Sequence, residues 1–352
     1  MCLFDLTEID TIAKFPSTRY QGSKLKYTDW IWHCVKDLSF ETVLDAFGGT
    51  GCVAHRMKQE GKSVTYNDIL KFNSIIGKAL IENEDCFISD RDLSFILNKH
   101  SNISYSNFIE RTFADIYFTD DENHWLDIVA TNIRHIQNEY KQAVAWFALF
   151  QSCIIKRPYN LFHRKNLYIR TQDVERSFGN KVTWDTPFPT HYRHFIEEAN
   201  AAIFFNGKKN RSLNKNVFNL SNHYDLVYID TPYISEKGIG VDYLDFYHFL
   251  EGLVDYENWE NRIDYQSKHK RLKINGSEWT NPQTIEHSFE CLLQQFKDSI
   301  LAISYRSDGI PNIYRICEIL KNNGKQVVLH ESRKMQYVLS KKQSTEILII
   351  GK

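Results

Sequence analysis

The chain has 352 residues, a formal net charge of −1 and 42% hydrophobic residues, values that are ordinary for a soluble globular protein of one or two domains. Its seven cysteines contain no CxxC pair, so neither a zinc cluster nor a disulfide framework is indicated, and a reducing cytoplasm is the expected location. Acidic residues at 5, 8 and 10 stand where a signal peptide would be basic, and the most apolar stretch, 144–155, is too short to span a bilayer.

The predicted elements begin with a β-α-β unit. Residues 42–44 read as a strand, a glycine turn follows, and a helix over 53–60 leads to a second strand over 63–66. This order predicts a parallel sheet with a right-handed crossover. The next stretch, 69–84, reads as a helix.

The rest of the chain returns to the same sheet after a long interruption. Residues 85–216 are largely helical and aromatic in pattern, and such a length is too great for a loop. Beyond it we predict strands at 226–229, 299–304, 326–330 and 346–350, with a helix at 313–321. We therefore expect an α/β fold in which 1–84 and 217–352 form one domain and 85–216 a helical insertion.

Positive charge is concentrated in three runs, although the net charge is close to zero. Basic side chains neutralise phosphates, and the aromatic residues between them, such as Tyr159 and Phe162, can stack on bases. For any single run, a solvated face is the alternative interpretation. The residues predicted to bind nucleic acid are Lys156, Arg157, Arg164, Lys165, Lys208, Lys209, Arg211, Lys268, Lys270 and Arg271.

A glycine-rich motif, Asp-Ala-Phe-Gly-Gly-Thr-Gly at 45–51, follows the first strand. Its glycines let the backbone approach a ligand and turn sharply into a helix. A nicotinamide fingerprint would be GxGxxG, whereas here an acid precedes the glycines. The motif resembles the first motif of S-adenosylmethionine-dependent methyltransferases. That resemblance implies cofactor contacts by Asp45, Phe47, Gly48, Gly49 and Gly51.

Asp68 ends the second strand and is a further candidate for the cofactor. A carboxylate at this position can accept hydrogen bonds from both hydroxyls of a ribose. The alternative is that Asp68 is the N-cap of the helix that follows.

A second motif, Asp230-Thr231-Pro232-Tyr233, follows the strand at 226–229. It resembles the Asp-Pro-Pro-Tyr motif of methyltransferases that act on adenine N6 or cytosine N4. An exocyclic amine is a poor nucleophile because its lone pair is delocalised into the ring. Asp230 and the Thr231 carbonyl can accept its N–H bonds and direct that lone pair at the methyl group. Pro232 makes the turn rigid, and Tyr233 would stack on the base, which contributes roughly 1–3 kcal/mol. An ordinary turn with a core tyrosine is the alternative.

The segment Arg-Tyr-Gln-Gly-Ser-Lys at 19–24 resembles the N-terminal motif of Dam-like DNA adenine methyltransferases, in which an aromatic residue and a lysine close over the methionine moiety. Tyr20 and Lys24 match those positions. The order of all the motifs is that of the Dam-like (alpha) group, and the resemblance covers nearly the whole chain. It implies a Rossmann-like catalytic sheet with 85–216 as target-recognition insertion. Asn219 stands where the family has an acid near the cofactor adenine.

The resemblance implies a site-specific DNA adenine N6-methyltransferase of the restriction–modification type. The methyl would pass directly from S-adenosylmethionine to a flipped-out base in double-stranded DNA, with no metal. It further implies a cognate restriction endonuclease as a functional partner, no membrane association, and a monomer. Cytosine N4 methylation is the nearest alternative, although that group more often carries Ser at the position of Asp230. Methylation of RNA or of a protein glutamine, and a non-catalytic nucleic-acid-binding relative, are the others.

Overall fold

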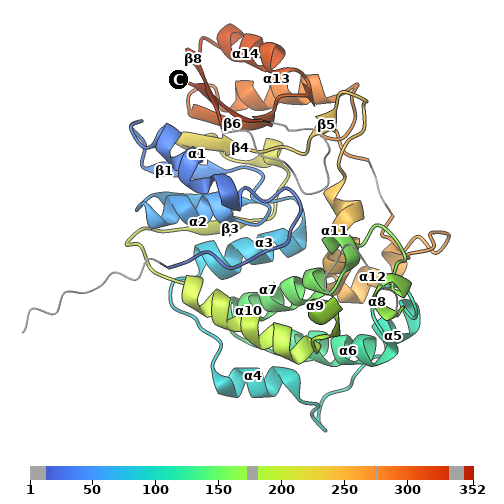
Figure 1. The fold of residues 1–352 in the computed structure, drawn as a ribbon. Helices are drawn as coiled ribbons and strands as arrows, with labels where there is room; N and C mark the ends of the chain where they lie inside the picture. Colours follow the sequence, from blue (N-terminus) through green and yellow to red (C-terminus); the bar gives the residue numbers. More distant parts are fainter. Residues whose placement is uncertain (1–12, 173–180, 274–275, 333–344) are drawn as a thin grey trace, which may run out of the picture.

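The structure is a computed structural model that describes residues 13–172, 181–273, 276–332 and 345–352. Within these residues the centre of the molecule is a seven-stranded sheet with the order β3-β2-β1-β4-β6-β9-β8 (Figure 1). This confirms the predicted α/β fold. The strands are β1 (Thr42–Asp45), β2 (Ser63–Asn67), β3 (Arg211–Leu213), β4 (Leu226–Ile229), β6 (Ile300–Arg306), β8 (Val327–Glu331) and β9 (Glu346–Gly351).

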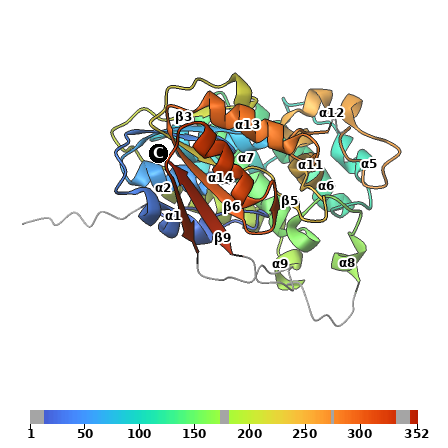
Figure 2. The ribbon, with the colours of Figure 1, turned by 90° about the horizontal axis from the view of Figure 1, so that it is seen from above.

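The directions of the strands place both sequence motifs at one edge of the sheet. Each adjacent pair from β3 to β6 is parallel, and β9 runs antiparallel between β6 and β8. Seen from above, β6 and β9 lie side by side (Figure 2). Because β1 and β4 are parallel neighbours, the glycine turn that follows β1 and the Asp-Thr-Pro-Tyr that follows β4 emerge together.

Helices cover both faces of the sheet, so its strands are apolar on both sides. Val43 of β1 packs into the core on one face and Leu44 into the core on the other. The first face is covered by α1 (Thr28–Val35), α2 (Cys52–Gln59), α3 (Lys71–Gly77) and the π-helical turn η2 (Lys78–Glu82). The second is covered by α13 (Ile285–Gln295) and α14 (Ile313–Asn322). A small pair of antiparallel strands, β5 (Ile234–Ser235) and β7 (Gly309–Ile310), lies beside them.

A helical layer lies below the sheet in Figure 1. Two of its helices, α11 and α12, follow β4 in the sequence and do not belong to the insertion. They pack into this layer, where the ring of Trp259 lies 5.0 Å from that of Phe113 and 5.2 Å from that of Phe249 between centroids. The helices of this layer are α4 (Asp90–Leu97), α5 (Phe108–Thr112), α6 (Asp120–Arg134), α7 (Glu139–Ile155), α8 (Tyr168–Thr171), α9 (Lys181–Asp185), α10 (Phe188–Ala202), α11 (Tyr243–Val254) and α12 (Tyr256–Arg262). Within the described residues, no helix is both long and apolar enough to cross a membrane.

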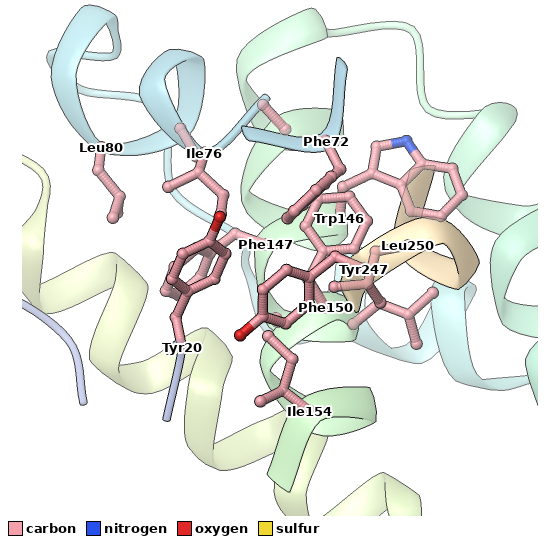
Figure 3. Packing of buried hydrophobic residues seen from close by; sticks show 14 of the residues in the cluster. Tyr20, Phe72, Ile76, Leu80, Trp146, Phe147, Phe150, Ile154, Tyr247 and Leu250 are labelled. Carbon is pink, nitrogen blue, oxygen red and sulfur yellow. The ribbon is translucent and has the colours of Figure 1, made fainter. Parts of the chain in front are cut away.

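The helical layer and the sheet share one core. Figure 3 shows Tyr20 beside Tyr247 of α11, with Phe72 of α3 and Phe150 of α7 packed close by. The rings of Tyr20 and Tyr247 are stacked, with centroids 4.4 Å apart. The N-terminal segment that carries Tyr20 is therefore held between the sheet domain and the helical layer.

The expected boundaries of the insertion need correction. The strand β3 lies inside 85–216, yet it pairs with β2 in the central sheet. The helical layer also recruits α11 and α12 from the part assigned to the catalytic domain. Each of the two expected regions therefore contributes elements to the other, and the sheet and α11 share a common core.

Within the described residues, three short 3-10 turns complete the fold: η1 (Leu25–Tyr27), η3 (Pro158–Asn160) and η4 (Val217–Asn219).

Candidate active site

The glycine turn after β1 rests on the ring of Tyr66. A Cβ added to Gly48 would lie 2.0 Å from Cε2 of Tyr66, so no side chain fits there. The Tyr66 hydroxyl donates a hydrogen bond to the Gly49 carbonyl at 2.7 Å, and this bond holds the turn against β2. Gly51 has φ +78° and precedes the first residue of α2, a conformation that favours glycine.

Asp45 ends β1 and carries a buried carboxylate, one oxygen of which lacks a hydrogen-bond partner in the described part of the chain. Its Oδ1 atom has no hydrogen-bond partner among the described residues. Burial, with added repulsion from Asp230, raises the pKa of Asp45 to about 8. A buried acceptor without a donor is costly, so this atom marks a place where a cationic or hydrogen-bonding ligand group fits. The ammonium of the methionine moiety of S-adenosylmethionine meets that requirement.

Asp68 is not the N-cap of α3, which is Leu70, but its carboxylate is held in the turn by hydrogen bonds. Its Oδ1 accepts from the Leu70 amide at 2.8 Å, and its Oδ2 accepts from the Gly49 amide at 2.9 Å and from Asn73 at 3.1 Å. Burial raises the pKa of Asp68 to about 6 despite these bonds. Oδ1 accepts only one of these bonds and has a second lone pair, so Asp68 can hold the turn and still accept from a ribose hydroxyl.

Asp230 lies directly after β4 in a buried network of four side chains. Lys24 Nζ is 3.0 Å from Asp230 Oδ1 and 3.3 Å from Glu346 Oε1. The hydroxyl of Tyr233 accepts from Lys24 at 2.7 Å and donates to Asp230 Oδ1 at 2.6 Å. Burial raises the pKa of Asp230, Lys24 counteracts this, and the charge of Glu346 adds to the rise.

Both motifs line one cavity of about 360 Å³. Asp45 and Asp230 reach it from neighbouring strands, since Asp45 pairs with Tyr228, two residues before Asp230. A carboxylate that fits a cofactor cation thus lies beside one that fits an exocyclic amine. The predicted residues in the lining are Tyr20, Lys24, Asp45, Phe47, Gly48, Gly49, Asp68, Asp230, Thr231 and Pro232.

Comparison with known families agrees with this arrangement. Residues 20–273 match the D12 class N6 adenine-specific DNA methyltransferases. The chain belongs to this family. It is therefore an adenine-specific DNA methyltransferase with the motif order that the sequence predicted.

Similar proteins are named type II methyltransferases or modification methylases. The type II methyltransferase M2.HphI of Haemophilus parahaemolyticus is 29% identical over 96% of this chain and 98% of its own length. The modification methylase StsI of Streptococcus sanguinis is 26% identical and the type II methyltransferase M.FokI of Planomicrobium okeanokoites 24% identical. This methyltransferase spans about half the length of the last two, 46% and 47%.

Three predicted residues of the methyltransferase site lie outside the cavity lining. Asn219 is exposed at the end of η4, whereas Asn216 and Val217 of the same segment line the cavity. Gly51 lies between Thr50 and Cys52, which both line the cavity. Tyr233 is half-buried behind the wall, with its ring edge-on to Tyr305 at 5.5 Å between centroids. Stacking of Tyr233 on the target base stays a prediction.

Two of the basic residues predicted to bind DNA are buried in the helical layer of this methyltransferase, so that prediction was wrong for them. Lys156 Nζ donates to the carbonyls of Trp184 and Thr186 at 2.7 and 2.6 Å and pairs with Glu122. Arg157 donates to the Leu161 and Tyr117 carbonyls. Both side chains are buried and bonded to partners inside the helical layer, so neither can reach a phosphate.

The second basic run does not line the cavity. Lys208, Lys209 and Arg211 are exposed, but they precede or begin β3, at the amino edge of the sheet. Lys208 pairs there with Glu41, the residue before β1. None of the three basic residues lines the cavity, and their contact with DNA stays a prediction.

Residues of the first and third runs are accessible at the surface of the methyltransferase. Arg164 and Lys165 are exposed in the loop after η3, and Lys165 pairs with Asp115. The third run, with Lys268, Lys270 and Arg271, lies between Arg262 and Lys273, which both line the cavity.

Sequence patterns missed several residues of this site. Glu346 reaches Lys24 from the far end of the chain, and Trp279 lines the cavity with its ring 5.0 Å from that of Phe47. The one available signal for Glu346 was a charged residue at the start of a strand that is otherwise apolar. Trp279 and the cavity-lining Arg262 and Lys273 carry no local motif.

Proposed function

We propose that this methyltransferase transfers the methyl of S-adenosylmethionine to N6 of an adenine flipped out of double-stranded DNA, with both held in the one cavity. The observation that carries the proposal is the placement of Asp45 and Asp230 on neighbouring strands with a shared cavity. One carboxylate suits the cationic cofactor, and the other suits the amine that receives the methyl. S-adenosylmethionine supplies a methyl group on a positively charged sulfur.

The residues around the turn after β1 would hold the cofactor. Asp45 Oδ1 would accept from the ammonium and so gain the partner that it lacks. Asp68 would accept from the ribose hydroxyls. Phe47 and Trp279, two aromatic rings that meet in the lining, would pack against the flat adenine of the cofactor.

Asp230 and the carbonyl of Thr231 would orient the target amine. Lys24 and Tyr233 occupy Asp230 Oδ1, so we assign Oδ2 to the amine. Hydrogen bonds to these acceptors direct the nitrogen lone pair at the methyl and keep water away from it. Asp230 then takes the proton that N6 must lose once it carries a methyl group. The raised pKa of Asp230 suits it to that role.

The target base must leave the duplex, because N6 takes part in base pairing. Extrusion costs a few kcal/mol, which contacts inside the pocket offset. The relatives that are named type II methyltransferases or modification methylases support a role in restriction–modification. We infer that this protein acts as a monomer that protects host DNA against a cognate endonuclease.

The test is transfer of labelled methyl from S-adenosylmethionine to methylation-free DNA, with the product nucleosides separated. We expect the label in N6-methyladenine and none with Asp230→Ala. Label in N4-methylcytosine would change the base assigned here, and full turnover by Asp230→Ala would refute the mechanism.

A further inference from the structure

A short hairpin-like loop, residues 263–272, rises from the rim of the cavity. Ile263 and Leu272 form an antiparallel bridge, and the Asp264 amide donates to the Arg271 carbonyl at 2.8 Å. The residues on either side, Arg262 and Lys273, line the cavity and are joined by a backbone hydrogen bond of 2.8 Å. The loop therefore stands next to the place proposed for the target base.

The loop is tied to the helical layer. The Tyr117 hydroxyl lies 2.8 Å from the His269 carbonyl and 2.7 Å from Nε2 of His248 on α11. Tyr117 itself is fully buried. The side chains near His269 are thus presented from a fixed backbone.

Arg271 hydrogen-bonds to Asp264 and forms a longer ion pair with Asp245. Its Nε lies 3.4 Å from Asp264 Oδ2, and its Nη1 lies 3.8 Å from Asp245 Oδ1. The side chain of Arg271 is still 42% exposed, so part of its guanidinium faces solvent. Within the described residues, Lys268 of the same loop has no ion pair and is exposed.

Asp245 connects Arg271 to the cavity. It lies in the first turn of α11, two residues after Tyr243, which lines the cavity. Its Oδ1 is buried and forms no hydrogen bond to any described residue, with His269 Nε2 at 3.9 Å. A buried carboxylate oxygen without a donor favours a cation that approaches more closely, as Arg271 would when DNA excludes water from the rim.

We propose that Arg271 reads a guanine next to the target adenine, and so sets part of the recognition sequence. This rests on the proposed action on duplex DNA. A guanidinium fork matches O6 and N7 of guanine in the major groove, the commonest base-specific contact. A flexible lysine can reach a phosphate from many directions. An arginine that already pairs with a carboxylate loses less side-chain conformational entropy when it forms a bidentate contact with a base.

The position of Arg271 limits which base pair it reads. It lies two residues from Lys273 at the rim, which is about 7 Å at roughly 3.3 Å per residue. Base pairs are stacked about 3.4 Å apart. The guanine is therefore expected within about three base pairs of the methylated adenine, on a surface that the helical insertion does not supply.

The experiment first maps the methylated sequence of the wild-type enzyme by sequencing, and then measures kcat/KM on duplexes in which each nearby guanine pair is replaced. Wild type should lose roughly 10- to 100-fold when the pair read by Arg271 is changed. Arg271→Lys, which keeps the charge, should lose most of this discrimination. Lys268→Ala, the matched control, should lower kcat/KM equally on all duplexes.

A chemical substitution in the DNA separates readout from a structural effect. Replacing that guanine with 7-deazaguanine removes N7 and should weaken wild type several-fold, with little further effect on Arg271→Ala. Three results would each overturn the inference: no guanine in the site within three pairs, full discrimination by Arg271→Lys, or an undiminished wild-type rate on every 7-deazaguanine duplex. A wild-type enzyme that makes no N6-methyladenine would overturn the proposed function together with it.

Discussion

Lys24 and Asp230 form a buried ion pair, with Nζ 3.0 Å from Oδ1. The N-terminal motif therefore acts on the carboxylate that follows β4 as well as lining the cofactor cavity. Because Glu346 shares the same ammonium, the charge state of Asp230 depends on three segments that are far apart in the sequence.

Asp230→Ala should abolish methyl transfer, because the amine loses the acceptor that directs its lone pair. Binding of S-adenosylmethionine should persist, because Asp45 and Asp68 stay in place. Isothermal titration and a labelled-methyl assay on the same preparation measure both properties. Loss of cofactor binding in this variant would show that Asp230 serves the cofactor instead.

Lys24→Met and Glu346→Gln should move the acid limb of the pH profile of kcat/KM in opposite directions. The ammonium of Lys24 lowers the pKa of Asp230, so its removal raises that pKa and activity then requires a higher pH. The charge of Glu346 raises the pKa of Asp230, so Glu346→Gln should extend activity to lower pH.

Lys24→Met also leaves two carboxylates together in the interior, which destabilises the fold. The double variant Lys24→Met/Glu346→Gln serves as the control, since it removes one of those charges. Thermal unfolding should show partial recovery of stability in the double variant. Shifts of both acid limbs in the same direction would contradict the assignment.

Cofactor affinity should rise with pH up to about 8. Below that pH the carboxyl of Asp45, whose pKa burial raises to about 8, holds a proton that it must release before it can accept from an ammonium. Titration calorimetry in buffers of different ionisation enthalpy should therefore detect proton release on binding near pH 7. Asp45→Asn should bind weakly and without this pH dependence.

The same substitution should stabilise the enzyme in the absence of cofactor. The pKa of Asp45 is higher in the folded chain than its ordinary value of 3.8, so this group destabilises the folded state increasingly as pH rises from there to about 8. Asp45→Asn should therefore raise the free energy of unfolding at pH 8, by about 1 kcal/mol. An unchanged unfolding midpoint would contradict the inference that the ionised carboxylate of Asp45 destabilises the folded state.

Gly48→Ala should disable the turn after β1. The added Cβ would lie 2.0 Å from the Tyr66 ring, so either the turn or the ring must move. We expect weaker cofactor binding and a loss of stability of about 1–3 kcal/mol, typical of overpacking. Gly61→Ala is the control, because nothing lies within 4 Å of its Cβ, although its φ of +74° carries a small cost of its own.

Much of the fold follows from local sequence because its central strands are apolar and bounded by glycine or acid. The stretch 226–229 was predicted with the bounds that β4 has, and the β1-α2-β2 unit differs by a residue at its ends. The short strand β3 was missed because Arg211–Leu213 contains an arginine and a serine and lies at an edge of the sheet. Pairing with β2, and not the propensity of its residues, makes it a strand.

The site was less predictable, because charge patterns do not reveal burial. Lys156 and Lys165 look alike in sequence, yet Lys156 is fully buried with carbonyl partners and Lys165 is exposed. Motifs identified Asp45, which ends β1, and Asp230, which directly follows β4. Glu346 belongs to the same network only because β9 runs antiparallel to β6, a long-range pairing that no local pattern encodes.

Neutralising the second basic run should leave DNA binding unchanged. The double variant Lys208→Ala/Lys209→Ala alters the amino edge of the sheet, away from the cavity. Arg262→Ala/Lys273→Ala removes two cations from the cavity lining and should weaken binding, with a smaller salt dependence. Fluorescence anisotropy at several salt concentrations separates the two. Equal losses would place the duplex across both edges.

The position of Glu346 has a consequence for the order in which a cell gains this activity. Lys24 is synthesised well before Glu346, yet the ammonium of Lys24 pairs with both Asp230 and Glu346. A partly translated chain can form the glycine turn and still lack the completed charge network. Methyl transfer that depends on this network would therefore begin only after Glu346 has been synthesised, so a chain that stops before Glu346 would lack it.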